Sequence, residues 1–222
     1  MTVFEQIRYI ASGMLVTFKL VPCVIVATII IGAFIGIIQF YRVPVLSRII
    51  DLYILAMRGV PPLVVIMLLF YTVNMSSGFV SALVCLTIYH SAYVAEIVRG
   101  GFQAIPHGQM EAGESLGLSY LSIMLRVYVP QVALQIIPAL CGQFILVIKD
   151  TTLIALVGLE DIMWAARQLV TITFNPMEAY LIVFFLYYFI CLIVELIAHR
   201  VEKKLSTDIK LSRTVKTNSQ EV

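Results

Sequence analysis

Residues 17–40 read TFKLVPCVIVATIIIGAFIGIIQF, with Lys19 as the only charged side chain among them. A helix needs about 20 apolar residues to cross the hydrocarbon core of a bilayer, so this stretch is long enough to span one. The whole 222-residue chain has the same character, being 61% hydrophobic and 13% charged with a mean hydropathy of +0.99. Soluble domains carry about 45–50% apolar and about 25% charged residues. The composition excludes a soluble enzyme and a disordered linker, and it indicates an integral membrane protein.

Four further apolar stretches have the length of a membrane span. They lie at about residues 60–77, 79–98, 131–148 and 178–198. Pro138 predicts a kink in the fourth span, because proline removes a hydrogen bond inside a helix. We therefore predict an all-α integral membrane protein with five transmembrane helices in a single domain, residues 1–222. Residues 3–16 and 45–57 are expected to form helices on the outer and inner membrane surfaces.

The distribution of Lys and Arg predicts the orientation. The tail from Arg200 carries six of them, and the segments after the first and third spans carry five more. The opposite side holds four. Cytoplasmic loops are enriched in Lys and Arg, so we expect the N-terminus outside and the C-terminus in the cytoplasm. A net charge of +2 gives no reason to expect a nucleic-acid partner.

Residues 99–130, RGGFQAIPHGQMEAGESLGLSYLSIMLRVYVP, form the one long segment between spans that is typical of ordered structure. Pro106 precedes a short helix through MEAGES, and Gly117 suits the position just after a helix end. Ser119 suits the N-cap of a second helix that runs up to Pro130. Two short helices that meet at a glycine predict a protruding cytoplasmic elbow, on which Ala112 and Gly113 would leave a bare patch for a partner. An ordinary loop between spans is the alternative.

This segment resembles a family signature, E-A-A-x3-G-x9-I-x-L-P, which belongs to the permeases of ABC importers. The chain has Glu111-Ala112-Gly113, then Gly117, then Val127-x-Val129-Pro130, with every spacing kept. Glycine replaces the second alanine, and valine stands at both aliphatic positions. Other blocks are similar to one branch, the permeases for polar amino acids of the histidine/glutamine type: RGVPPLVV (58–65), SAYVAEIVRGGFQAIPHGQ (91–109), IKDTTLIALVGLEDI (148–162) and FLYYFICLIVELIAHRVEKKL (185–205).

The resemblance implies the type I ABC importer (MetI-like) permease fold in a bacterial cytoplasmic (inner) membrane. It also implies that the elbow, through Glu111, Ala112, Gly113 and Gly117, docks on a cytoplasmic ATPase. None of the 12 glycines is followed by Lys, so the chain has no P-loop and we expect no cofactor in it. ATP and Mg²⁺ would bind to two partner ATPase subunits. The other implied partners are a second permease subunit, identical or paralogous, and an extracytoplasmic substrate-binding protein.

Polar residues within the apolar stretches are candidates for substrate contact. Lys149-Asp150-Thr151-Thr152 interrupts an apolar run, as the broken helices of transporters do at their substrate sites. An ion pair that shapes a subunit interface is the alternative role for these charges. Glu160 and Asp161 would neutralise the side chain of a cationic amino acid, or else cap a helix. His90, Ser91 and Tyr93 would contact the amino acid, or else bond between helices.

The combined interpretation is a permease subunit of an ATP-driven importer for polar amino acids. Cationic substrates (histidine, arginine, lysine, ornithine) come ahead of glutamine and glutamate. An ATP-independent secondary transporter is the alternative, and it predicts inverted repeats, which the five unequal spans do not show. A membrane enzyme is disfavoured, because the chain has no HExxH or GxSxG motif. The four cysteines stand singly, without CxxC, so we expect no metal site.

Overall fold

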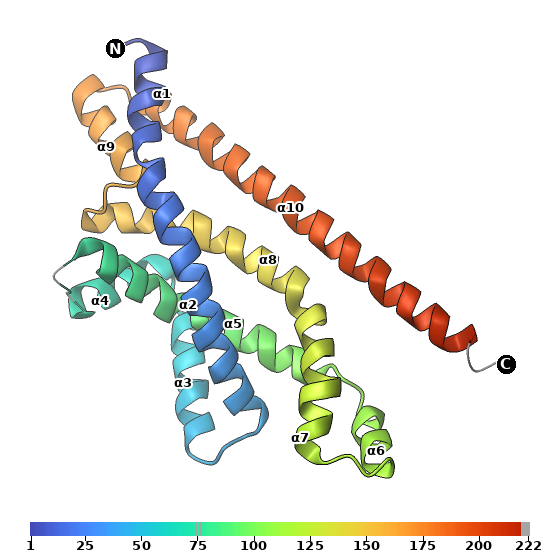
Figure 1. Cartoon of the computed structure of the whole chain (residues 1–222). Helices are drawn as coiled ribbons and strands as arrows, with labels where there is room; N and C mark the ends of the chain where they lie inside the picture. The colour runs from blue at the N-terminus through green and yellow to red at the C-terminus, as the bar shows by residue number, and fades with distance from the viewer. Residues whose placement is uncertain (74, 76, 219–222) are drawn as a thin grey trace.

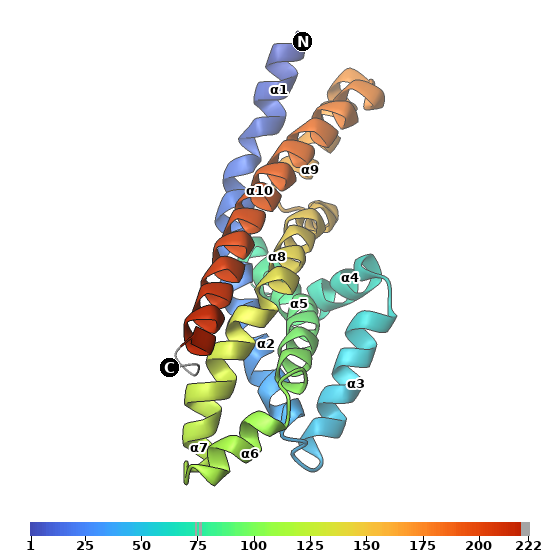
Figure 2. The same cartoon turned by 90° about the vertical axis from the view of Figure 1, so that its right-hand side faces the viewer.

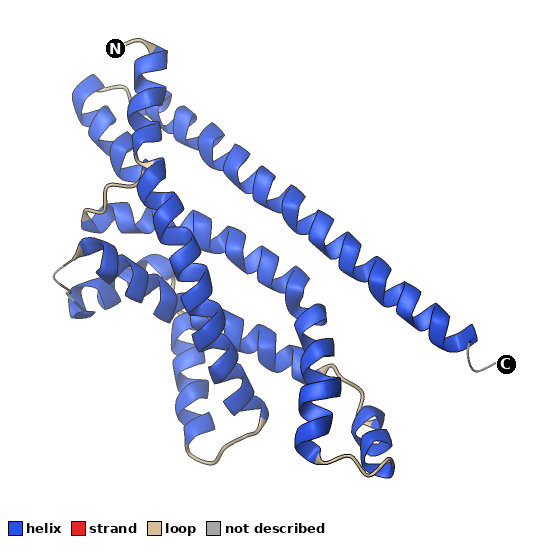
Figure 3. Ribbon diagram, in the orientation of Figure 1, coloured by secondary structure: helices blue, strands red, loops and turns tan. Residues whose placement is uncertain are grey.

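The computed structural model describes residues 1–73, 75 and 77–218, with side chains described as far as residue 203. In this part of the chain all regular structure is helical (Figure 3). The helices are α1 (Val3–Ser12), α2 (Met14–Phe40), α3 (Leu46–Gly59), α4 (Pro62–Val73), α5 (Gly78–Gln103), α6 (Gly108–Ser115), α7 (Tyr120–Ile123), the π-helical η1 (Met124–Tyr128), α8 (Val129–Ile154), the 3₁₀ turn η2 (Ala155–Val157), α9 (Ile162–Thr173) and α10 (Pro176–Asn218). The sequence-based expectation of an all-helical chain is confirmed.

Helices α2 and α5 pack closely against each other, and two glycines of α2 allow it. A Cβ atom on Gly32 would lie 2.6 Å from Cβ of Val94, and one on Gly36 would lie 2.5 Å from the carbonyl oxygen of Ala95. Glycines four residues apart lie on one face of a helix, so the backbone of α2 comes close to that of α5 at both positions. Lipid tails are as apolar as leucine, so this close packing, rather than hydrophobic burial, holds the two helices together.

Helix α1 leads into α2 along nearly the same direction (Figure 1). Val3–Phe40 forms one apolar helical stretch, instead of a surface helix followed by a span. Ile10 of α1 is fully buried with Ile162 and Leu169 of α9 and Ala179 of α10. The backbone of Asp161 approaches Gly13 so closely that a Cβ there would lie 2.4 Å from its carbonyl. These contacts explain the difference, because α1 has a buried apolar partner that the sequence alone does not reveal.

Helices α3 and α4 form a bent pair where the sequence analysis expects a surface helix and the second span. Their axes differ by 118° at the break around Val60-Pro61, and together they are long and apolar enough to form one bent span. Ile50 and Ile54 of α3 are buried against Ala92 and Ala95 of α5. The apolar face of α3 thus packs on the bundle. Helix α4 has 12 residues, fewer than the roughly 20 that a straight span needs. Four other helical stretches of the described chain have span character.

Helix α8 continues through Lys149-Asp150-Thr151-Thr152, where the sequence analysis expects an interruption. The helix accommodates these residues because the hydroxyls of Thr151 and Thr152 bond to carbonyls of their own helix, at 2.8 Å each. The chain leaves its helical path at Gly158, whose φ of +91° favours glycine. Pro138 lies inside α8, as expected, and Figure 1 shows the ribbon change direction along this helix.

Candidate functional site

The predicted elbow is formed by α6 and α7, at the opposite end of the molecule from the N-terminus (Figures 1 and 2). Helix α6 ends at Ser115, and Gly117 follows with a φ of +72°. The Gly117 amide donates to the carbonyl of Glu114, and the Leu118 amide donates to that of Gly113 at 3.1 Å. Ser119 is the N-cap of α7, since its hydroxyl accepts from the Ser122 amide at 3.3 Å. The expected positions of Gly117 and Ser119 are both observed.

Gly113 holds the elbow together from inside. A Cβ atom at this position would lie 2.7 Å from Cδ1 of Ile123, which is fully buried. The expected bare patch for a partner is therefore half correct: Ala112 is exposed, whereas Gly113 is buried against α7. Glycine at this point of the signature permits the close crossing of α6 and α7.

The outward face of the elbow is apolar at its tip. Leu116 is 79% exposed and Leu121 is 66% exposed, and Glu111 also faces outward. Exposed leucines beside a rigid turn form the kind of surface that docks in a groove of another protein. The sequence analysis missed Leu116, although its place between a helix end and a glycine with positive φ is a usable signal.

His90 and Asp150 come together between α5 and α8. Nδ1 of His90 lies 2.8 Å from Nε2 of Gln143, and Nε2 of His90 lies 3.4 Å from Oδ2 of Asp150. The second contact is at ion-pair distance without hydrogen-bond geometry. His90 is 1% exposed and Gln143 is 5% exposed, whereas the Asp150 side chain is 22% exposed. The sequence analysis missed Gln143, a polar residue at membrane depth in the fourth expected span.

Ser91 and Tyr93 bond to different neighbours. The Ser91 hydroxyl lies 2.7 Å from the hydroxyl of Tyr53 on α3, and it donates to the carbonyl of Ile88. The Tyr93 hydroxyl lies 2.9 Å from that of Tyr89, and the guanidinium of Arg58 lies 5.6 Å from the Tyr93 ring centroid. Of the three candidates on α5, His90 faces α8 and Ser91 faces α3.

Lys149 and Thr151 lie on the α10 side of α8. Lys149 is exposed and lines a cleft of about 570 Å³ together with Tyr187 and Glu195 of α10. The Thr151 hydroxyl is 3.4 Å from that of Tyr187. Asp150 faces His90 instead, so the neighbouring charges of Lys149 and Asp150 lie on different faces of α8.

Glu160 and Asp161 differ sharply. The Asp161 side chain is buried and caps α9, accepting from the Trp164 amide at 2.8 Å. Burial raises the pKa of this carboxyl to about 6, because its charged form loses water. Glu160 is exposed, and its carboxylate has no hydrogen bond or ion pair to the part of the chain that the structure describes. Helix capping thus applies to Asp161, and Glu160 is the carboxylate open to a ligand.

Comparison with known proteins identifies the architecture. Residues 28–207 match the family described as the binding-protein-dependent transport system inner membrane component. The arginine transport system permease protein ArtQ of Bacillus subtilis is 31% identical over 208 residues, which cover 91% of this chain and 95% of that protein. The probable glutamine ABC transporter permease protein GlnP of the same organism is 31% identical over 168 residues, covering 73% and 77%.

Solved structures of ABC transporters are similar to this chain as well. A crystal structure of an amino acid ABC transporter with histidines superimposes with a TM-score of 0.81 at 29% identity, covering 89% of this chain and 94% of that one. The inward-facing methionine transporter MetNI shares the fold, with a TM-score of 0.74 at 17% identity over 89% and 96%. The predicted MetI-like fold, the multi-pass inner-membrane location and the role of a transport subunit with ATP hydrolysis on a separate partner are thereby confirmed. The chain belongs to the family of inner-membrane components of binding-protein-dependent transport systems.

Proposed function

We propose that this chain is the membrane-spanning subunit of an ATP-driven importer for polar amino acids, with cationic amino acids as its preferred substrates. The relatives that support an amino-acid substrate are named for arginine and for glutamine, and the similar solved transporter is described with histidines. Glu160 supports the cationic preference, because an exposed carboxylate without a partner in the described chain is available to neutralise a positively charged side chain.

The observation that carries the proposed function is the elbow. It lies directly between α5 and α8, the two helices that bring His90 and Asp150 together. A partner ATPase that moves the elbow would therefore move both helices relative to each other. Leu116 at the tip docks on this partner, and Gly117 sets the angle between α6 and α7. ATP and Mg²⁺ bind to the partner subunits, and this chain provides no cofactor site.

The elbow faces the cytoplasm, and the N-terminus lies outside. The α2–α3 loop and α7 lie at the elbow end of the bundle, and the N-terminus lies at the other end (Figures 1 and 2). Arg42 belongs to this loop, and Arg126 belongs to η1, which directly follows α7. Cytoplasmic loops carry the excess of arginine and lysine, which supports this orientation.

A second permease subunit completes the translocation pathway, and an extracytoplasmic binding protein delivers the substrate. Helix α10 presents large apolar side chains outward, which lipid alone would satisfy: Phe184 is 60% exposed and Phe189 is 55% exposed. The support for a second subunit comes from the charged residues beside this apolar face. Lys149 and Glu195, which line the cleft beside it, are costly in contact with lipid and favour a protein neighbour or a water-filled path.

The substrate contacts the polar groups at three places in this chain. Glu160 accepts the cationic group, with Asp161 behind it holding α9 in position. Lys149 borders the cleft beside α10, and the buried Thr151 lies behind it, with its hydroxyl 3.4 Å from that of the cleft residue Tyr187. The other candidates, His90, Ser91 and Tyr93, belong to α5. His90 and Ser91 are each 1% exposed, so the substrate reaches them only when α5 moves relative to α8 and α3 during transport.

The test is purification of the tagged chain in mild detergent, followed by reconstitution of the assembly in liposomes. We expect a P-loop ATPase to copurify, and its activity to rise when a binding protein loaded with arginine is added. Accumulation of labelled arginine in the liposomes should require ATP in their lumen, which corresponds to the cytoplasm. An ATPase-free oligomer that still transports amino acids would instead make the chain a secondary transporter. Equal stimulation by arginine and glutamine would refute the cationic preference alone.

A further inference from the structure

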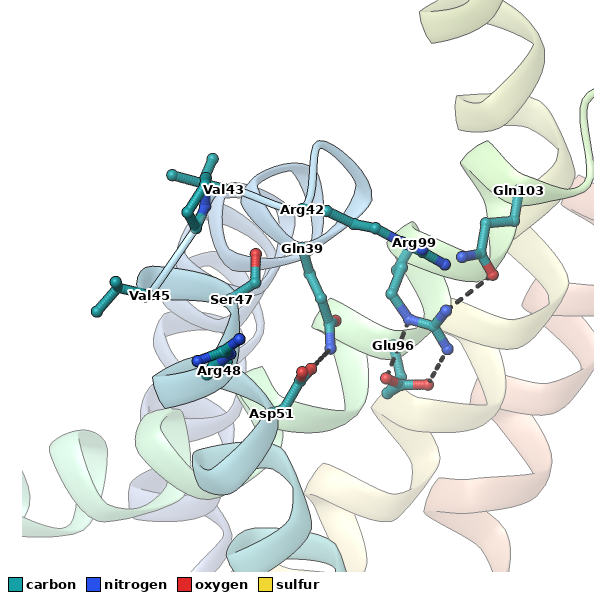
Figure 4. A pocket seen from close by; sticks show the side chains of 11 residues that line it. Gln39, Arg42, Val43, Val45, Ser47, Arg48, Asp51, Glu96, Arg99 and Gln103 are labelled. Atoms are coloured by element: carbon teal, nitrogen blue, oxygen red, sulfur yellow. Dashed lines mark hydrogen bonds and ion pairs between the residues drawn. The ribbon is translucent and has the colours of Figure 1, made fainter.

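A hollow of about 790 Å³ opens at the elbow end of the bundle, between the α2–α3 loop and α5 (Figure 4). Three arginines line it: Arg42 from the loop, Arg48 from α3 and Arg99 from α5. Two carboxylates, Asp51 and Glu96, line it as well. The function proposed above does not use this hollow.

Both carboxylates already bond to other side chains of this chain. Glu96 accepts two hydrogen bonds from Arg99, at 3.1 and 2.8 Å, and its Oε2 lies 3.4 Å from Arg58. Oδ1 of Asp51 accepts from Nε2 of Gln39 at 2.6 Å. Arg42 and Arg48 have no carboxylate within 4.0 Å among the described residues. The bond from the neutral Gln39 amide leaves the charge of Asp51 in place, so three guanidinium groups against two carboxylates give the hollow a surplus of one positive charge, which favours an anionic ligand.

The loop that carries Arg42 is strained. Arg42 has a φ of 50° and Val45 a φ of 66°, in the left-handed region that non-glycine residues rarely adopt. For a β-branched residue such as valine this is a true outlier. Strain of this kind persists where the surrounding structure requires it, and it clusters at ligand sites. The conformation directs the Arg42 side chain across the hollow toward Arg99, so that two guanidinium groups face the same space (Figure 4).

Apolar side chains stand beside the charged ones at the rim of the hollow and along α3. Val43 and Val45 line its rim, and Val45 is 68% exposed. A smaller hollow of about 390 Å³ shares Gln39, Asp51 and Glu96 with it. This second hollow adds Arg58 and, on its α3 side, Ile54 and Leu55, of which Leu55 is 69% exposed. A free inorganic anion needs no such apolar continuation. A ligand with a charged head and a hydrocarbon tail uses both parts.

We propose that this hollow is a binding site for the phosphate group of an anionic phospholipid. Arg42 and Arg48 donate to the phosphate oxygens, because the planar guanidinium fork matches phosphate geometry. Arg99, fixed by Glu96 and by Gln103 at 2.8 Å, forms the positive base of the site. One acyl chain lies along α3 past Leu55. The site lies at the membrane face where anionic lipids attract basic side chains.

The test uses the purified transporter assembly and counts bound lipid by native mass spectrometry. The probe is phosphatidylglycerol in phosphatidylcholine nanodiscs, compared with phosphatidylcholine alone. For Arg42→Gln/Arg48→Gln we expect phosphatidylglycerol affinity to fall roughly a hundredfold, since each lost hydrogen bond between guanidinium and phosphate accounts for about a factor of ten. The control is Arg126→Gln/Arg200→Gln, which removes two charges from the same face outside the hollow. It should keep the wild-type affinity.

Each other outcome overturns the proposal. Equal losses in both double variants would mean diffuse surface charge, and an unchanged lipid count in the Arg42/Arg48 variant would mean that the hollow binds no lipid. Inorganic phosphate that binds as tightly as the lipid would identify a free-anion site. Loss of the ATPase subunit from the Arg42/Arg48 variant, with the lipid count unchanged, would assign both arginines to that partner. Arg42→Lys/Arg48→Lys keeps the charge, so a folded variant with intermediate affinity supports the guanidinium contacts.

Discussion

Replacing Gly117 by alanine isolates the contribution of one backbone conformation to coupling. Gly117 has a φ of +72°, and a Cβ atom there would meet nothing within 4 Å. The change therefore causes no clash, and its cost is the left-handed backbone alone, about 1–2 kcal/mol for an L-residue. If the strained elbow leaves the angle that fits the ATPase, affinity between the subunits falls by about 5- to 30-fold, since 1.4 kcal/mol is a factor of ten.

The matched control is Gly108→Ala, in the first turn of α6. This glycine also has open space around its Cβ position, but its φ is not in the left-handed region. Alanine there should be neutral, or stabilise the elbow by about 0.4–1 kcal/mol through the unfolded state. Gly117→Asn adds bulk and yet tolerates the left-handed region, so it should be the milder of the two Gly117 variants.

The assay titrates purified ATPase subunit onto the detergent-solubilised chain and follows both binding and stimulated ATP hydrolysis. We expect a weaker affinity for Gly117→Ala, a near-normal one for Gly108→Ala, and an intermediate one for Gly117→Asn. Membrane insertion and yield should be the same for all three variants. Identical affinities for the two alanine variants would refute the role of the positive φ in setting the elbow.

Three further predictions concern the packing of α2 on α5 and the two carboxylates that precede α9. Gly36→Ala should destabilise the chain by about 1–3 kcal/mol in thermal unfolding, because the new Cβ would lie 2.5 Å from a carbonyl oxygen of α5; Gly59→Ala, with open space, is its control, and equal melting temperatures would contradict the reasoning. Glu160→Gln should reduce uptake of arginine much more than uptake of glutamine, and equal reductions would leave Glu160 a structural role. Asp161→Ala should remove the α9 cap, worth about 1 kcal/mol, and lower the melting temperature by about 2–4 °C. Asp161→Asn should keep the cap, so the same loss in both variants would argue against it.

Much of the elbow was predictable because its signals are local. A glycine three residues before a second helix and a serine at an N-cap act through the backbone of neighbouring residues. The boundary expected at Pro130 is absent, because Tyr120–Val157 forms one apolar helical stretch that joins the elbow to the fourth span. Gly117 and Ser119 therefore have the positions that their sequence context predicts. Gly113 was interpreted as part of an exposed patch, because the partner that buries it, Ile123, belongs to another helix.

The candidate substrate residues show the limit of local patterns. A polar residue in an apolar stretch indicates that a partner exists, but the stretch does not name the partner. His90 faces Gln143 and Asp150 across more than 50 positions of sequence, and Ser91, the next residue, faces Tyr53. The adjacent pair Lys149 and Asp150 separates in the same way, because successive residues of a helix point about 100° apart.

The membrane class, the helical content and the turn of the elbow follow from local sequence, because hydrophobic run length and turn chemistry act within a few residues. Tertiary structure decided which helices pair and which charges meet. It placed α1 against α9 and α10, closed α2 onto α5 at Gly32 and Gly36, and bent α3 against α4. It also gathered Arg42, Arg48 and Arg99 around one hollow. These outcomes depend on the shapes of surfaces far apart in the chain, and no local period in the sequence carries that information.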